Sequence, residues 1–108
     1  MTEDTHGPRL ILTDTQLSTL LFVAEFQARR NRSPSFAEIA AEFRIDPGSA
    51  HHRIARLGHA GAVTRPGPKE IKLTDHAIAL PEVIELYKRL QDERDRENLA
   101  RANEAPTA

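Results

Sequence analysis

Five side chains that can donate hydrogen bonds lie close together in one short stretch of this 108-residue chain. They are Ser49, His51, His52, Arg53 and Arg56. Arginine donates to guanine edges and to phosphates, and serine and histidine can donate to the same acceptors. We therefore predict that the stretch is the exposed face of a helix that contacts duplex DNA. The alternative interpretation is that these residues form only the solvated face of an amphipathic helix.

Two flanking segments offer further groups for contacts with phosphate. Ser33 and Ser35 precede a predicted helix, whose first N–H groups bind anions. Arg65 and Lys69 lie at a turn rich in proline and glycine, where they are predicted to reach the DNA backbone or an adjacent minor groove. Charges at the tip of a hairpin can also serve solubility alone.

Capping signals predict three helix starts in the first fifty residues. They are the capping boxes Thr13 with Gln16 and Ser35 with Glu38, and the pair Asp46-Pro47. The three helices are expected to end near Arg30, at Phe43 and at Gly61, where glycine favours the left-handed conformation that closes helices. The connection 44–46 is short, so the second and third helices must cross steeply, as in a helix-turn-helix.

The pattern changes to strands after Gly61. Residues 62–65 and 70–73 alternate in polarity, and the segment between them, with two prolines and a glycine, predicts a turn. Thr74 is expected to cap a short helical turn, and Pro81 to open a last helix that reaches about Ala102. The predicted fold class is therefore mainly α with a small β-hairpin: a winged helix-turn-helix followed by a C-terminal helix.

The chain resembles the DNA-binding domain of the LexA repressor family. The shared features in the first two helices are Leu12-Thr13, Gln16, Pro34 and Ala37-Glu38-Ile39-Ala40. The resemblance continues through Ile54-Ala55-Arg56-Leu57, Gly61 and Ile71-Lys72-Leu73, so it covers about residues 12–73. It implies a winged helix-turn-helix that binds double-stranded DNA and regulates transcription.

The resemblance does not extend to the whole repressor. The chain is one residue shorter at the start of the third helix, and its residues there differ, so the target sequence is not implied. Only 35 residues follow the hairpin, and we therefore expect no peptidase domain and no self-cleavage.

Apolar residues outside the predicted helix-turn-helix core suggest a homodimer. The last helix carries Val83, Leu86, Tyr87 and Leu90 at spacings i, i+3, i+4 and i+7. The first helix is apolar nearly all round, with Leu17 and Leu21 among its surplus residues. We predict that these six residues form the dimer interface. The alternative is that the last helix folds back on its own domain.

The expected organisation has four parts. Residues 1–11 are predicted to be a flexible arm, 12–80 the winged helix-turn-helix domain, 81–102 a dimerisation helix and 103–108 a disordered tail. The longest apolar run spans 20–24, too short to cross a membrane. A location in the prokaryotic cytoplasm or nucleoid is expected.

The composition argues against several classes of function. The chain has no cysteine, which excludes disulfides, thiolate catalysis and the common structural zinc sites. The adjacent histidines His51 and His52 point about 100° apart on a helix and cannot share one metal ion. We expect no enzyme activity, no cofactor, no metal and no small-molecule ligand that the sequence identifies.

Charge is divided unequally along the chain. Residues 12–73 hold nine Lys and Arg against six Asp and Glu, whereas residues 74–108 hold five against eight. A basic body suits a nucleic-acid partner. The predicted function is a sequence-specific regulator of transcription, a dimeric repressor on an inverted-repeat operator. The alternative function is a winged-helix module that binds another protein in a larger assembly.

Overall fold

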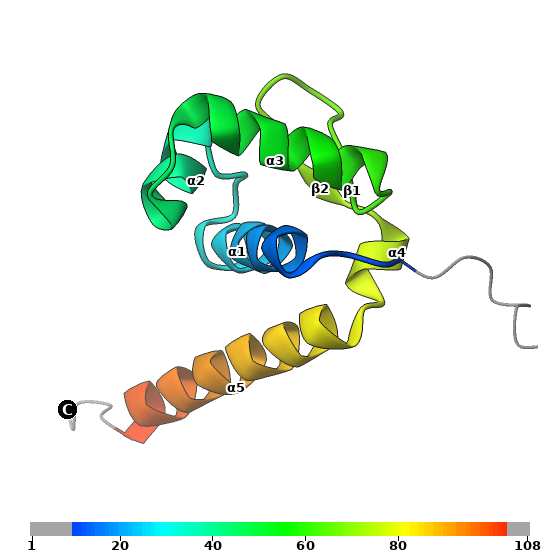
Figure 1. Cartoon of the computed structure of the whole chain (residues 1–108). Helices are drawn as coiled ribbons and strands as arrows, with labels where there is room; N and C mark the ends of the chain where they lie inside the picture. Colours follow the sequence, from blue (N-terminus) through cyan, green and yellow to red (C-terminus); the bar gives the residue numbers. More distant parts are fainter. Residues whose placement is uncertain (1–9, 104–108) are drawn as a thin grey trace, which may run out of the picture.

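The computed structural model describes residues 10–103, where five helices and two short strands follow one another (Figure 1). The helices are α1 (Asp14–Arg30), α2 (Phe36–Phe43), α3 (Pro47–His59), α4 (Asp75–Ile78) and α5 (Pro81–Asn103). The strands β1 (Val63–Thr64) and β2 (Lys72–Leu73) pair antiparallel, with Val63 opposite Leu73. This order confirms the predicted fold class. The expected arm and tail lie outside the described residues, except for positions 10, 11 and 103.

The helix starts are confirmed by their caps. In each capping box, the hydroxyl of the cap accepts from a backbone N–H three residues later, and the side chain there accepts from the N–H of the cap. The pairs are Thr13 with Gln16 for α1 and Ser35 with Glu38 for α2. Asp46 caps α3 by accepting from the N–H of Ser49 at 2.7 Å. Sequence therefore sets where these helices begin.

Left-handed residues end the first two helices and follow the third. Asn31 and Arg44 take φ values of 59° and 58°, and Gly61 takes 85°. Gly61 fills the left-handed position that the sequence predicted for it, two residues beyond the end of α3. The chain reverses at Arg44, so only three residues separate α2 from α3. This short connection gives the helix-turn-helix its tight turn.

The wing, defined here as residues 62–73, is less regular than predicted. Each strand has two residues instead of four. Beyond Thr64 the two strands part, and the Arg65 side chain binds the carbonyls of Pro68 and Glu70 across the gap. The prolines in this turn have no N–H to continue a ladder. The wing is thus a short hairpin with a side-chain brace across its tip.

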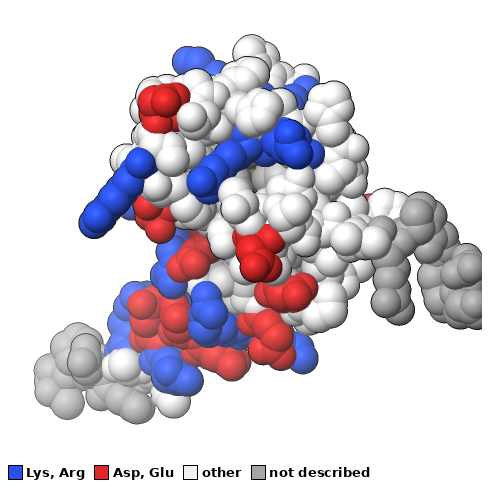
Figure 2. Space-filling model, viewed as in Figure 1, with Lys and Arg blue, Asp and Glu red and all other residues white. Residues whose placement is uncertain are grey.

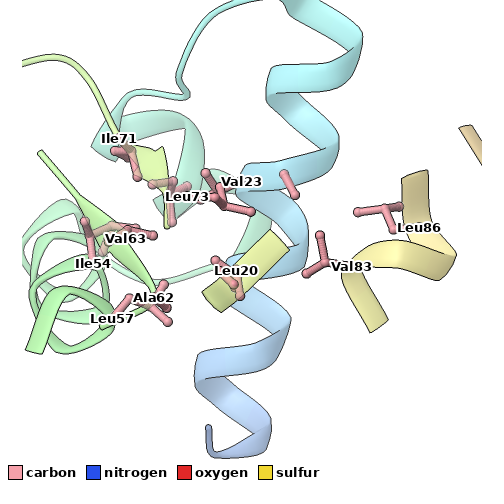
Figure 3. Packing of buried hydrophobic residues seen from close by; sticks show 14 of the residues in the cluster. Leu20, Val23, Ile54, Leu57, Ala62, Val63, Ile71, Leu73, Val83 and Leu86 are labelled. Carbon is pink, nitrogen blue, oxygen red and sulfur yellow. The ribbon is translucent and has the colours of Figure 1, made fainter. Parts of the chain in front are cut away.

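Helix α1 is buried from two sides, as its apolar sequence predicted. Figure 3 shows Leu20 and Val23 between two sets of side chains. One set comes from α3 and the wing and the other from α5. They are Ile54, Leu57, Val63, Ile71 and Leu73 on the first side, and Val83 and Leu86 on the second. A single hydrophobic core therefore joins the winged body to the C-terminal helix.

The first half of α5 belongs to this core. Val83, Leu86 and Leu90 are only 0%, 4% and 7% exposed, and Tyr87 is half-buried. Arg29 of α1 adds ion pairs to Glu25 at 2.8 Å and to Glu93 of α5 at 2.9 Å, and its hydrogen bonds to these carboxylates raise its pKa. The last helix therefore folds back on its own domain, with Val83, Leu86 and Leu90 packed toward α1, and the dimerisation role of residues 81–102 stays a prediction.

The second half of α5 has little support from the body. Leu90 is its last buried residue, and the helix continues to Asn103. Figure 1 shows this end extending past the rest of the body. Among the described helices, none is both long enough and apolar enough to cross a bilayer.

Candidate nucleic-acid interface

Helix α3 has one buried face and one exposed stripe. Ala50, Ile54 and Leu57 are buried against α1 and the wing. About a third of a turn away lie three of the predicted donors, all exposed, at positions that stack along the helix. They are Ser49, His52 and Arg56. The stripe presents a hydroxyl, an imidazole and a guanidinium to solvent.

Arg53 lies apart from this stripe. It is partly buried, its guanidinium lies 4.9 Å from the centre of the Phe43 ring, and Nη1 donates to the Thr19 hydroxyl at 3.3 Å. Thr19 is fully buried in α1. Arg53 lies three residues after Ala50 and therefore at the edge of the buried face of α3. The structure therefore uses Arg53 to join α3 to α1 and α2.

His51 is also engaged within the protein. Its ring lies 4.7 Å from the Phe36 ring, between centroids, at an interplanar angle of 53°. Phe36 is the first residue of α2. His51 remains exposed, but its ring lies on the side of α3 that faces α2. Of the five donors predicted on this helix, three share the outward stripe and two contact α1 or α2.

The start of α2 uses its two serines for structure. The Ser35 hydroxyl caps the helix. The Ser33 hydroxyl accepts from the N–H of Ile71 at 3.0 Å and donates to its carbonyl at 3.2 Å, which ties the start of α2 to the wing. Neither hydroxyl is free for a ligand: Ser35 closes the first turn of α2, and Ser33 holds the segment before it beside the wing.

Glu38 and Arg32 form an ion pair at the same end of α2. Two guanidinium nitrogens of Arg32 bind the carboxylate at 2.9 and 2.8 Å. These bonds, and the backbone N–H of Ser35, lower the pKa of Glu38 to about 2. The carboxylate raises the pKa of Arg32 in return. The charge of Arg32 is therefore largely compensated.

The wing places its two predicted cations differently. Arg65 binds the carbonyls of Glu70 at 2.8 Å and Pro68 at 2.7 Å, and lies 5.0 Å from the centre of the Phe36 ring. Lys69 is exposed at the tip. A hollow between the wing and the start of α2 is lined by both cations together with Arg32, Ser33 and Phe36. Lys72, exposed on β2, is a further cation that the sequence analysis did not select.

The surface charge follows the division seen in the sequence. Figure 2 shows Lys and Arg side chains, with some acidic ones among them, on the part of the body formed by α2 and α3, and acidic and basic side chains closely mixed along α5. The body is thus the part suited to a polyanion.

Sequence reasoning missed the aromatic residues that fix these cations. Arg30 and Arg32 lie 5.4 and 4.8 Å from the centre of the Phe26 ring. Phe43 and Phe36 serve Arg53 and Arg65 in the same way. Arg30 lies one helical turn from Phe26, a local spacing, whereas the contacts of Phe43 with Arg53 and of Phe36 with Arg65 join different elements and have no such pattern in the sequence.

The residues predicted for a dimer interface are divided by the structure. The stripe Val83, Leu86 and Leu90 faces α1 of its own chain and has almost no surface left for a partner. Leu17 and Leu21 are half-buried and line two hollows beside the start of α5. A contact between copies through the stripe would require α5 to leave α1.

Comparisons with known proteins agree with this geometry. Residues 10–69 match the LexA DNA binding domain. The chain belongs to the LexA DNA-binding domain family. A solved structure described as the M. tuberculosis transcriptional regulator MosR is also similar, with 28% identity and a TM-score of 0.51 over 88% of this chain and 78% of that one. No individually curated protein matches the chain.

The family match covers the helix-turn-helix and most of the wing. The chain is therefore a DNA-binding regulator, and its partner is double-stranded DNA. Residues 70–103, which include β2, α4 and α5, lie outside the family match. The comparison with MosR covers 88% of this chain. Within residues 10–103, no group of three or more His, Asp or Glu side chains is arranged to hold a metal ion.

Proposed function

We propose that this LexA-family chain is a dimeric transcriptional repressor that binds an inverted-repeat operator. The observation that carries the proposal is the outward stripe of Ser49, His52 and Arg56 on α3. A major groove about 12 Å wide accepts one helix, and residues near the start of a recognition helix contact the base edges. Repression would follow from occupation of promoter DNA, in the cytoplasm of a prokaryotic cell.

The contacts divide into those that select sequence and those that bind any DNA. Arg56 on α3 is the candidate for a bidentate contact with guanine, and Ser49 and His52 add single donors. Lys69 and Lys72 on the wing are candidates for phosphates, which fix the position of the protein without reading bases.

Selection of bound duplexes from a random pool tests this function directly. We expect an enriched sequence with two inverted half-sites whose centres lie about 34–36 Å apart. Binding to it should weaken steeply as salt rises, since each phosphate contact releases counterions. A pool that yields no preferred sequence, or affinity independent of salt, would favour a protein-binding module instead.

Self-association is supported by surfaces beside α5. Leu17 and Leu21 retain part of their surface there, and Leu99 on the projecting half is 63% exposed. One flank of α5 carries charges that complement a second copy running antiparallel. In that register Glu85 lies opposite Arg96, and Arg89 lies opposite Asp92. Both ends of the helix then gain partners, as two-fold symmetry requires.

Cysteine cross-linking tests this arrangement, because the chain has no native cysteine. A mixture of the Glu85→Cys and Arg96→Cys variants should form a disulfide between chains. Neither variant should do so alone, since each residue lies about 17 Å from its own copy in this register. In a parallel pair, each variant should form a disulfide alone, and the mixture should give no disulfide between residues 85 and 96. Sedimentation equilibrium of the parent protein decides whether a dimer exists.

A further inference from the structure

The guanidinium of Arg65 is already occupied inside the wing. Nε donates to the carbonyl of Glu70 and Nη2 to the carbonyl of Pro68, at 2.8 and 2.7 Å. These bonds span the turn of which Lys69 is the exposed tip. One side chain thus closes the gap that the short strands leave open.

The flat side of the same guanidinium contacts α2. It lies 5.0 Å from the centre of the Phe36 ring, a distance typical of a cation–π contact. Phe36 in turn contacts His51 of α3. A single aromatic ring therefore connects the wing, through Arg65, with the helix that carries the outward stripe.

The base of the wing is held by a different set of bonds. Ser33 binds both backbone groups of Ile71, and the amide of Gln27 donates to the hydroxyl of Ser33 at 3.1 Å and to the carbonyl of Ile71. Ile71 is itself buried in the core. The base is consequently fixed without Arg65, and only the tip depends on it.

We propose that Arg65 and Phe36 are positioning residues: they set the place of the wing tip relative to α3 and do not themselves contact DNA. The inference rests on the proposed function, in which α3 and the wing contact one duplex. Lys69 is then the cation that the contacts of Arg65 and Phe36 hold toward the DNA backbone. The sequence alone made Arg65 and Lys69 equivalent, whereas the structure gives them different tasks.

The variant Arg65→Lys separates a positioning role of Arg65 from a direct contact with DNA phosphate. Lysine keeps the positive charge but cannot donate two parallel bonds or stack as a flat group. Loss of two hydrogen bonds is expected to weaken DNA binding about three- to tenfold. The dependence of affinity on salt should stay unchanged, and hydrogen exchange at Glu70, whose N–H donates to the Gly67 carbonyl, should accelerate.

A phosphate contact by Arg65 would behave in the opposite way. Arg65→Lys would then bind like the parent, and Arg65→Ala would lower the slope of log affinity against log salt by about one. That pair of results overturns the proposal. Lys69→Arg is the matched control, since it changes a neighbouring cation outside the brace and should leave the exchange of Glu70 as it was.

Phe36→Leu tests the second member of the brace without altering charge. It should accelerate exchange at Glu70, and the double variant with Arg65→Lys should be no weaker in DNA binding than the weaker single variant. Fully additive losses would mean that the two residues act separately, against the proposal. Hydrogen exchange at Glu70 is measured without DNA. If it is unchanged in Arg65→Lys, the positioning role of Arg65 is wrong, whether or not the protein binds DNA. A parent protein that binds no duplex defeats the proposed function alone.

Discussion

The two sides of α1 carry surfaces of different construction. On one side, Arg53 of α3 and Arg65 of the wing are held against phenylalanine rings, and Arg65 also binds backbone carbonyls. On the other side, α5 contributes apolar residues to the core, and its projecting half carries charges of both signs. The body thus holds some arginines against other elements and leaves others, such as Arg56, exposed, whereas the arginines of the projecting half of α5 lie in solvent.

The comparison teaches that a cation's sequence neighbours do not determine its task. Arg53 and Arg56 are three residues apart on α3, yet one contacts Thr19 and Phe43 and the other is exposed. A group that already has partners within the protein serves to position the surface, and a group without them remains free to bind DNA.

The largest difference is expected within α5. Leu86→Ala should lower the free energy of unfolding by about 2–5 kcal/mol, because it leaves a cavity between α5 and α1. Leu99→Ala should change it by less than about 0.5 kcal/mol, since Leu99 is exposed. Chemical denaturation of both variants measures the contrast. Equal effects would show that the two halves of α5 do not differ in this way.

The second contrast sets Arg56 against Arg53. Arg56→Ala should weaken binding to the selected operator by about 1–3 kcal/mol and relax preference at one base, with the free energy of unfolding unchanged. Arg53→Ala should instead lower the free energy of unfolding by about 1 kcal/mol, through the lost hydrogen bond and the lost contact with Phe43. Titration of operator and scrambled duplexes, with denaturation curves for both variants, gives the result. A stability loss in Arg56→Ala alone would reverse the assignment.

The wing tip is expected to affect salt dependence more than sequence preference. Lys69→Ala should lower the slope of log affinity against log salt by about one on any duplex. Arg101→Ala, which removes a charge from the far end of α5, is the matched control and should leave the slope close to that of the parent. If both variants lower the slope equally, net charge, and not the wing, governs the effect.

The smallest expected effect concerns acid. Arg32 and the Ser35 N–H hold the pKa of Glu38 at about 2, below its ordinary 4.5. Ionised Glu38 therefore stabilises the fold fully above about pH 4.5, and this contribution is lost as the pH falls through 2. Glu38→Gln keeps the capping box and should flatten that part of the acid denaturation curve. Glu42→Gln on the same helix serves as the control. If it flattens the acid denaturation curve equally, the loss of stability in acid does not come from Glu38.

Local sequence determined the elements and their order. Thr13, Ser35 and Asp46 supply caps that need only neighbours three residues away, and Gly61 takes the left-handed turn that its missing Cβ permits. Spacing of apolar residues also showed which face of α3 is buried, and that α1 is buried from two sides. These features depend on contacts within one or two helical turns, so the chain reveals them without a structure.

Tertiary structure decided what the surface residues do. The sequence assigned the stripe of Val83, Leu86 and Leu90 to a partner chain, with packing on its own domain as the alternative, and only the packed core shows that α1 covers it. Arg53 and Arg65 looked like free donors, because the groups that engage them come from other elements. Local spacing does not encode such long-range contacts, whose energies exist only once the core has brought the elements together.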